Sequence, residues 1–95
     1  MTSTTRDEIT QKLRGIVEPY VRNKEALGSI GEETNLLEDL QIDSMHLVDI
    51  ILDTEEEFGI EIDDDAAERL VTVGAAIGVI EEQLRKKEAE SADGE

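Results

Sequence analysis

Apolar side chains recur at helical intervals along this chain, and no segment shows the alternation typical of a strand. In residues 44–58, a helix wound at about 100° per residue brings one apolar stripe together. Its members are Leu47, Ile50, Ile51, Thr54 and Phe58. Further helices are expected at residues 6–22, at residues 64–70 and after Thr72, in a chain whose length allows one domain. The pattern predicts an all-α, four-helix bundle with three main helices, one short helix and a long loop between helices 1 and 2.

Capping and breaking residues set the expected ends of these helices. The segment Thr5-Arg6-Asp7-Glu8 has the form of a capping box, and Pro19 predicts a kink or an early end in the first helix. Glycines 28 and 31 mark residues 23–35 as loop, and Gly59 is expected to end the helix at 44–58. The folded domain should span residues 1–87, followed by a disordered acidic tail at 88–95.

A second, smaller apolar strip lies on the helix at residues 44–58, away from the core-facing stripe. It consists of Met45, Val48 and Leu52, and acidic side chains border it. Packing needs only one stripe, so this strip indicates a surface that meets a partner. The alternative is that loop residues such as Leu37, which with Leu36 and Leu40 is expected to anchor the loop, cover it.

The distribution of charge narrows the class of partner. The net charge is −16, and no Lys or Arg falls between Glu25 and Glu68, an interval with sixteen acidic residues. Binding to nucleic-acid phosphates needs clustered cations, so that function is excluded. Partners with basic patches are expected, because the acidic surface would attract them. The alternative is a solvated acidic face that only maintains solubility.

No metal site or membrane segment is expected. An EF-hand loop needs a glycine at its sixth position, but loops starting at Asp53 or Asp63 place Phe58 or Glu68 there. The N-terminus lacks the apolar region of a signal peptide, and no later run is long enough to span a bilayer. The chain is therefore expected to be soluble and cytoplasmic.

Ser44 lacks the neighbouring base that a catalytic serine needs. The only histidine, His46, lies two residues away on the same expected helix, where side chains do not face each other. The chain has no cysteine, so any thiol chemistry would come from a cofactor. Ser44 at a helix start is better interpreted as an attachment point, with helix N-capping as the simpler alternative.

Three motifs carry a resemblance to a known family. They read N-L-L-E-D-L-Q-I-D-S-M at residues 35–45, E-E-E-F-G-I-E-I at 55–62 and T-V-G-A-A-I at 72–77. Together they resemble the acyl carrier proteins, and the similarity extends from about Ile9 to Leu84. The resemblance implies a noncatalytic carrier whose Ser44 is esterified to 4′-phosphopantetheine, delivered from coenzyme A by a separate phosphopantetheinyl transferase (holo-synthase) with magnesium. The thiol of that cofactor would hold acyl groups as thioesters.

The same resemblance assigns roles to other residues. The surface read by basic patches on acyl-transferring or acyl-extending enzymes of fatty-acid or lipid biosynthesis would comprise Asp43, Met45, His46, Val48, Asp49, Leu52, Glu55 and Glu56. The candidate walls of an acyl-chain cavity are Leu47, Ile51, Phe58, Ile62 and Ile77, for which core packing is the simpler explanation. The carrier would be a monomer.

Several positions depart from the usual family pattern. His46 stands where an acid is common, Gln41 and Ile42 replace a usual glycine-alanine pair, and Asp63 replaces a frequent proline. These departures, with Pro19 in the first helix, favour a specialised carrier. Two alternatives stay open: a carrier of aminoacyl or polyketide cargo, and an acidic interaction module without a cofactor.

Overall fold

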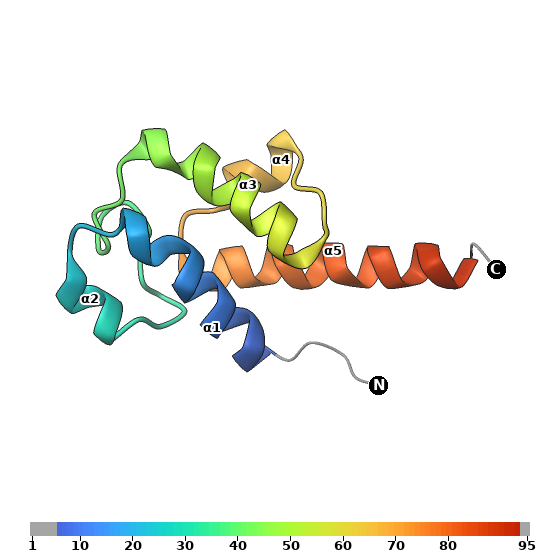
Figure 1. Cartoon of the computed structure of the whole chain (residues 1–95), viewed down its shortest axis with the longest axis horizontal. Helices are drawn as coiled ribbons and strands as arrows, with labels where there is room; N and C mark the ends of the chain where they lie inside the picture. The colour runs from blue at the N-terminus through green and yellow to red at the C-terminus, as the bar shows by residue number, and fades with distance from the viewer. Residues whose placement is uncertain (1–5, 94–95) are drawn as a thin grey trace.

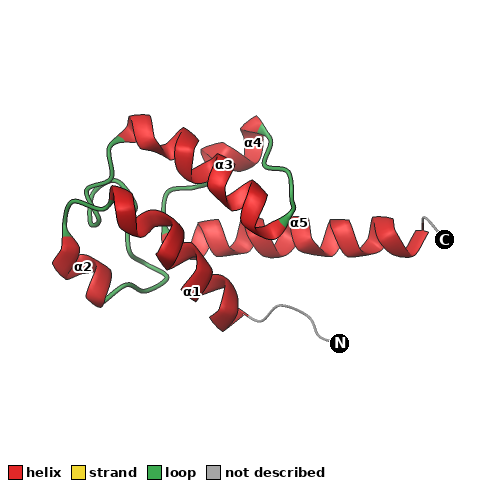
Figure 2. Ribbon diagram, in the orientation of Figure 1, coloured by secondary structure: helices red, strands yellow, loops and turns green. Residues whose placement is uncertain are grey.

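The protein is a bundle of helices built around three long ones. The computed structural model describes residues 6–93, with side-chain surroundings through residue 89. Its α-helices are α1 (Arg6–Val17), α2 (Lys24–Gly28), α3 (Leu47–Phe58), α4 (Asp64–Glu68) and α5 (Val73–Asp93), with 3₁₀ helices η1 (Glu18–Tyr20) and η2 (Ser44–His46). Helices α1 and α3 pack against each other, and α1 also packs along α5 (Figure 1). The described residues form no strand, which confirms the all-α prediction (Figure 2).

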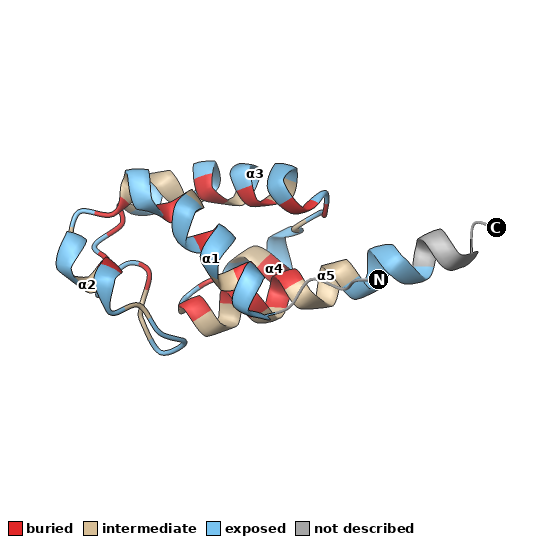
Figure 3. Cartoon of the chain, turned by 60° about the horizontal axis from the view of Figure 1, so that its bottom comes forward, coloured by how far each residue is buried: buried red, intermediate tan, exposed pale blue. Residues whose placement is uncertain are grey.

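One apolar core holds the three long helices together. Its most deeply buried side chains include Ile9 and Val17 of α1 and Ile77 and Ile80 of α5. The core-facing side of α3 is the predicted stripe: Ile50, Thr54 and Phe58 are buried, and Leu47 and Ile51 are partly buried against them. Buried positions accordingly lie on the facing sides of the helices (Figure 3). Helix periodicity alone was sufficient to place this face.

The first helix ends where its proline predicts. Helix α1 stops at Val17, and Pro19 lies in the first turn of η1. Proline lacks an N–H and cannot continue the helical hydrogen bonding, so the chain tightens into a 3₁₀ turn that ends at Tyr20. Thr5 of the expected capping box lies outside the described residues.

The long loop contains a helix that the sequence analysis did not predict. Helix α2 occupies five residues and buries Leu27. Asn23 caps its start, with a side chain that accepts from the N–H of Ala26 at 3.4 Å. Leu36 and Leu40 are buried as expected, but Leu37 is exposed, so its predicted anchoring role is wrong. The cause is a local turn: the Asn35 side chain accepts from the backbone N–H groups of Leu37 and Glu38 and turns Leu37 outward.

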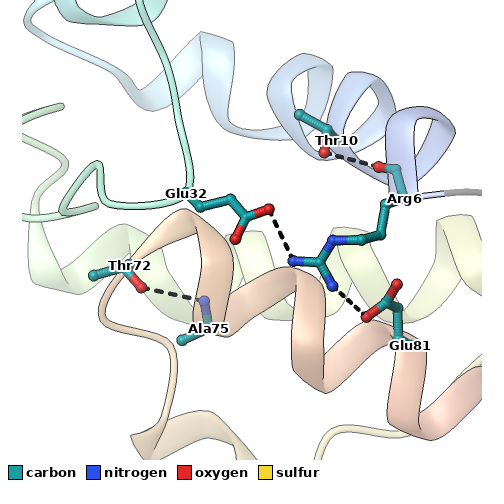
Figure 4. A network of polar contacts seen from close by, with 6 residues as sticks. All are labelled: Arg6, Thr10, Glu32, Thr72, Ala75 and Glu81. Atoms are coloured by element: carbon teal, nitrogen blue, oxygen red, sulfur yellow. Dashed lines mark hydrogen bonds and ion pairs between the residues drawn. The ribbon is translucent and has the colours of Figure 1, made fainter.

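Backbone bonds fasten this loop to the start of α5. Val73 N–H donates to Thr34 at 2.9 Å, and Gly74 N–H donates to the Glu32 carbonyl at 2.8 Å. A Cβ on Gly74 would lie 2.9 Å from that carbonyl oxygen, so the close approach requires glycine. Figure 4 shows the same junction, where Arg6 pairs with Glu32 and Glu81. Helix α5 begins after Thr72, as predicted, and Thr72 caps it: its hydroxyl accepts from Ala75 N–H at 3.1 Å.

The connection from α3 to α5 is closed by caps at each step. Gly59 ends α3 in the left-handed region at φ 64°, as predicted, and Lys87 Nζ donates to the Phe58 carbonyl at 3.5 Å. The carboxylate of Asp63 caps α4 by accepting from Ala66 N–H at 2.9 Å. Helix α4 is two residues shorter than the predicted 64–70 segment.

Helix α5 runs further than the sequence predicted. It continues through Asp93, which differs from the disordered tail expected from residue 88. Lys, Glu and Ala are strong helix formers, so nothing in Lys86–Ala89 ends the helix. Residues 94–95 of the expected tail lie outside the described part, and the boundary of the domain at residue 87 stays a prediction.

Candidate functional site

Ser44 lies in a tight turn that delivers the chain into α3. We call residues Asp43–His46 the serine turn. The Asp43 carboxylate accepts from Met45 N–H at 3.2 Å, and His46 N–H donates to the Asp43 carbonyl at 2.8 Å. N-capping was the simpler explanation for a serine at this position. The structure instead gives the capping role to Asp43. The Ser44 side chain is exposed, and its hydroxyl forms no hydrogen bond with any described residue.

The segment that enters the serine turn is fixed by burial. Leu40 and Ile42 are both buried, and Ile42 N–H donates to the Leu36 carbonyl at 3.2 Å. Gln41 between them is held at φ 57°, the only positive φ of a non-glycine residue in the described chain. Gln41 is exposed between these two buried neighbours, in a left-handed conformation that non-glycine residues rarely adopt.

The downstream end of the serine turn meets η1. The rings of His46 and Tyr20 pack with centroids 5.1 Å apart and tilted by 33°. His46 Nδ1 lies 3.3 Å from Asp49 Oδ2, and the Tyr20 hydroxyl donates to Asp53 Oδ2 at 3.3 Å. Partial burial, followed by the charge and hydrogen bond of Asp53 and the charge of Asp49, raises the pKa of Tyr20 above 10.0. Tyr20 and Asp53 were not candidates from the sequence, because their contact depends on the turn at Pro19.

The second apolar strip of α3 is open. Met45, Val48 and Leu52 are 76%, 60% and 54% exposed, and Leu37 does not cover them, being 38% exposed itself. Asp49 and Glu56 beside the strip are also exposed. Two other candidate partner residues are partly engaged within the molecule. Asp43 caps the serine turn, and Glu55 accepts from Ile62 N–H at 2.8 Å.

A small apolar cavity lies behind α3. It has a volume of about 10 Å³, and Leu47, Ile50, Thr54, Ile62 and Ile80 are among its lining residues. Leu47 and Ile62 were expected cavity walls, whereas Ile51, Phe58 and Ile77 do not line this space. The volume is about that of one water probe, so an acyl chain could enter only if the helices move apart.

The only histidine of the chain pairs with a carboxylate. His46 Nδ1 faces Asp49. In the described part of the chain, no group of three or more His, Cys, Asp and Glu side chains is arranged to hold a metal ion. None of the described helices is long and apolar enough to cross a membrane.

The chain matches known proteins over this same region. A family model described as a phosphopantetheine attachment site matches residues 11–80. An acyl carrier protein of Thermotoga maritima is 38% identical over 80 residues, covering 84% of this chain and 96% of that protein. The chain belongs to the acyl carrier protein family. A second acyl carrier protein, from Lactobacillus acidophilus, is 43% identical over 75 residues, covering 78% of this chain and 90% of that protein.

A solved structure supports the same assignment. An acyl carrier protein from Enterococcus faecalis superimposes with a TM-score of 0.69 at 34% identity, covering 83% of this chain and 98% of that one. This carrier therefore has the helical fold of its family, carries a 4′-phosphopantetheine group and is not an enzyme. An exposed serine hydroxyl without an internal partner fits the attachment of that group.

Proposed function

We propose that Ser44 is the attachment residue and that its hydroxyl carries the 4′-phosphopantetheine. The strongest support comes from the serine turn. Asp43, and not Ser44, caps its backbone, so the exposed Ser44 hydroxyl is left free. A phosphate there lies at the start of α3, where backbone N–H groups and the helix dipole favour an anion. When bound, the cofactor supplies the thiol that this cysteine-free chain lacks.

Mass spectrometry tests the attachment residue directly. Wild-type protein incubated with a broad-specificity phosphopantetheinyl transferase and coenzyme A should gain one phosphopantetheine unit, and Ser44→Ala should gain none. Ser29→Ala is a matched control, because Ser29 is also exposed but lies in the loop after α2. Modification of Ser44→Ala, or none of the wild type, would refute the assignment.

We further propose that the outer face of α3 docks the enzymes that load and unload this carrier. The open strip of Met45, Val48 and Leu52 supplies apolar contact, and His46, Asp49 and Glu56 surround it with polar groups. Asp43 and Glu55 lie at the margins of this face. Partners with basic patches fit best, because their Lys and Arg side chains would meet a surface dense in carboxylates.

Binding measurements distinguish docking through this face from a general effect of charge. Glu56→Lys should weaken binding to a cognate acyl-transferring enzyme by about fivefold or more, and added salt should weaken binding of the wild type. Asp49→Lys should act similarly, although it also removes the contact with His46. Glu33→Lys makes the same charge change in the exposed loop and should have a much smaller effect. Equal losses for Glu33→Lys and Glu56→Lys would contradict docking through α3.

The last part of the proposed function concerns the pathway that this carrier serves and the place of its acyl chain. We infer a specialised, monomeric, cytoplasmic carrier for fatty-acid, lipid or related biosynthesis, whose acyl chain retracts between the helices past Leu47, Ile51, Phe58, Ile62 and Ile77. Since the cavity of about 10 Å³ is far too small for a chain, loading should separate α3 from α5. The NMR chemical shifts of the Leu47 and Ile62 methyl groups should therefore change on acylation, while those of Ile9 in α1 should stay the same. Unchanged Leu47 and Ile62 resonances would show that the cargo stays outside.

A further inference from the structure

The serine turn is short and has its own cap at only one end. Helix η2 spans three residues, and the Asp43 carboxylate secures its first turn by accepting from Met45 N–H. Its other end, His46, has no side-chain cap at the start of α3 and instead packs its ring against Tyr20 with centroids 5.1 Å apart. This distance lies in the range of favourable aromatic pairs. This ring contact joins the serine turn to η1.

Both rings are held by further contacts on the same side of α3. Asp49 and Asp53 follow His46 by three and seven residues, so all three lie on one helix face. His46 Nδ1 lies 3.3 Å from Asp49 Oδ2, which orients the imidazole, and Asp53 Oδ2 accepts from the Tyr20 hydroxyl at 3.3 Å. The second bond is long for an O–H···O hydrogen bond, so the ring of Tyr20 should matter more than its hydroxyl.

We propose that Tyr20 and His46 are positioning residues that hold the serine turn in the conformation a transferase modifies. This inference rests on the proposed attachment at Ser44. A turn of only four residues without the ring contact would sample other conformations, and the transferase would have to order it before the serine oxygen could react. The effect should therefore fall on the step after docking. Tyr20 lies on η1 and is not part of the proposed docking face, so it reports this role independently.

The kinetics of phosphopantetheine transfer from coenzyme A test the pair. Tyr20→Leu should lower kcat roughly two- to tenfold with little change in KM for the carrier, as expected for the loss of one aromatic pair. Tyr20→Phe keeps the ring and should retain most of kcat, and His46→Phe should likewise be closer to wild type than His46→Leu. Because both residues act through one contact, the double variant Tyr20→Leu/His46→Leu should be no slower than the worse single variant.

An exchange measurement gives a readout that does not depend on modification. In Tyr20→Leu, amide hydrogen exchange should accelerate at Met45 and His46 but stay unchanged at Ile77 in the core of α5. If Tyr20→Leu fails to fold, the comparison of His46→Leu with His46→Phe at the partly exposed site decides. Wild-type kcat with unchanged exchange at Met45, or multiplicative losses in the double variant, would overturn the positioning role. Failure of the transferase to modify wild-type Ser44 would instead refute the attachment proposal.

Discussion

At the scale of single residues, Gln41 has a backbone conformation that is unfavourable for any residue with a side chain. Its φ of 57° lies in the left-handed region, which costs a non-glycine residue on the order of 1–2 kcal/mol. Acyl carrier proteins commonly have glycine at this position, so the conformation belongs to the turn rather than to Gln41. Leu40 and Ile42 are both buried, so the backbone is anchored on each side of Gln41.

Replacing Gln41 by glycine should therefore stabilise the fold. Glycine removes the strain but loses more backbone entropy on folding, so the free energy of unfolding in urea should rise by only about 0.5–1 kcal/mol. Gln11→Gly, in the exposed middle of α1, is the control and should lower it by about 1 kcal/mol. A similar loss in both variants would contradict the strain at Gln41.

The single tyrosine of the chain offers a direct pH measurement. Burial and the carboxylates of Asp53 and Asp49 raise the pKa of Tyr20, so phenolate absorbance should appear above pH 10.0. The folded protein holds this proton more tightly than the unfolded chain. The resulting stabilisation is complete below the ordinary pKa and is lost as pH rises through the raised value. Asp53→Asn should move the absorbance midpoint back toward 10.0, and a wild-type midpoint already there would contradict the contact.

At the scale of elements, the long periodic helices and the short α4 could be predicted, but α2 could not. The apolar periods of α1, α3 and α5 appear in the sequence, as do Gly59 at the end of α3 and the segment at residues 64–70 that contains α4. Helix α2 was missed because its five residues carry no repeat, and burial of Leu27 stabilises it instead. The open strip of α3 was predictable from spacing. The contact between Tyr20 and His46 was not, because it depends on how two distant turns meet.

Two glycines of α5 should respond to alanine in opposite ways, as measured by the free energy of unfolding. Gly78→Ala should stabilise α5 by about 1 kcal/mol, because no atom lies within 4 Å of the added methyl group. Gly74→Ala should destabilise the protein, because its Cβ would lie 2.9 Å from the Glu32 carbonyl oxygen and push the loop away. Urea unfolding of both variants measures the difference. Stabilisation by Gly74→Ala would show that the loop moves aside at little cost.

At the scale of the whole molecule, repulsion between carboxylates dominates. The net charge is −16, while the described ion pairs, such as Lys12 with Glu57 and Arg69 with Glu82, are exposed and contribute little each. Salt screens both, so added sodium chloride should raise the thermal unfolding midpoint. The double variant Glu38→Gln/Glu61→Gln should show a smaller rise. A midpoint that falls with salt would mean that the ion pairs outweigh the repulsion.

The extended end of α5 has a consequence for how this carrier can be held. The outer end of α5 and the start of α3 lie at opposite ends of the molecule, whose longest extent is 46 Å (Figure 1). Lys87 ties α5 to the end of α3 just before the helix leaves the body. A surface or a fused protein joined to the projecting end would stand clear of the serine turn. The protein can therefore be immobilised through the C-terminal end of α5 while Ser44 stays accessible to enzymes.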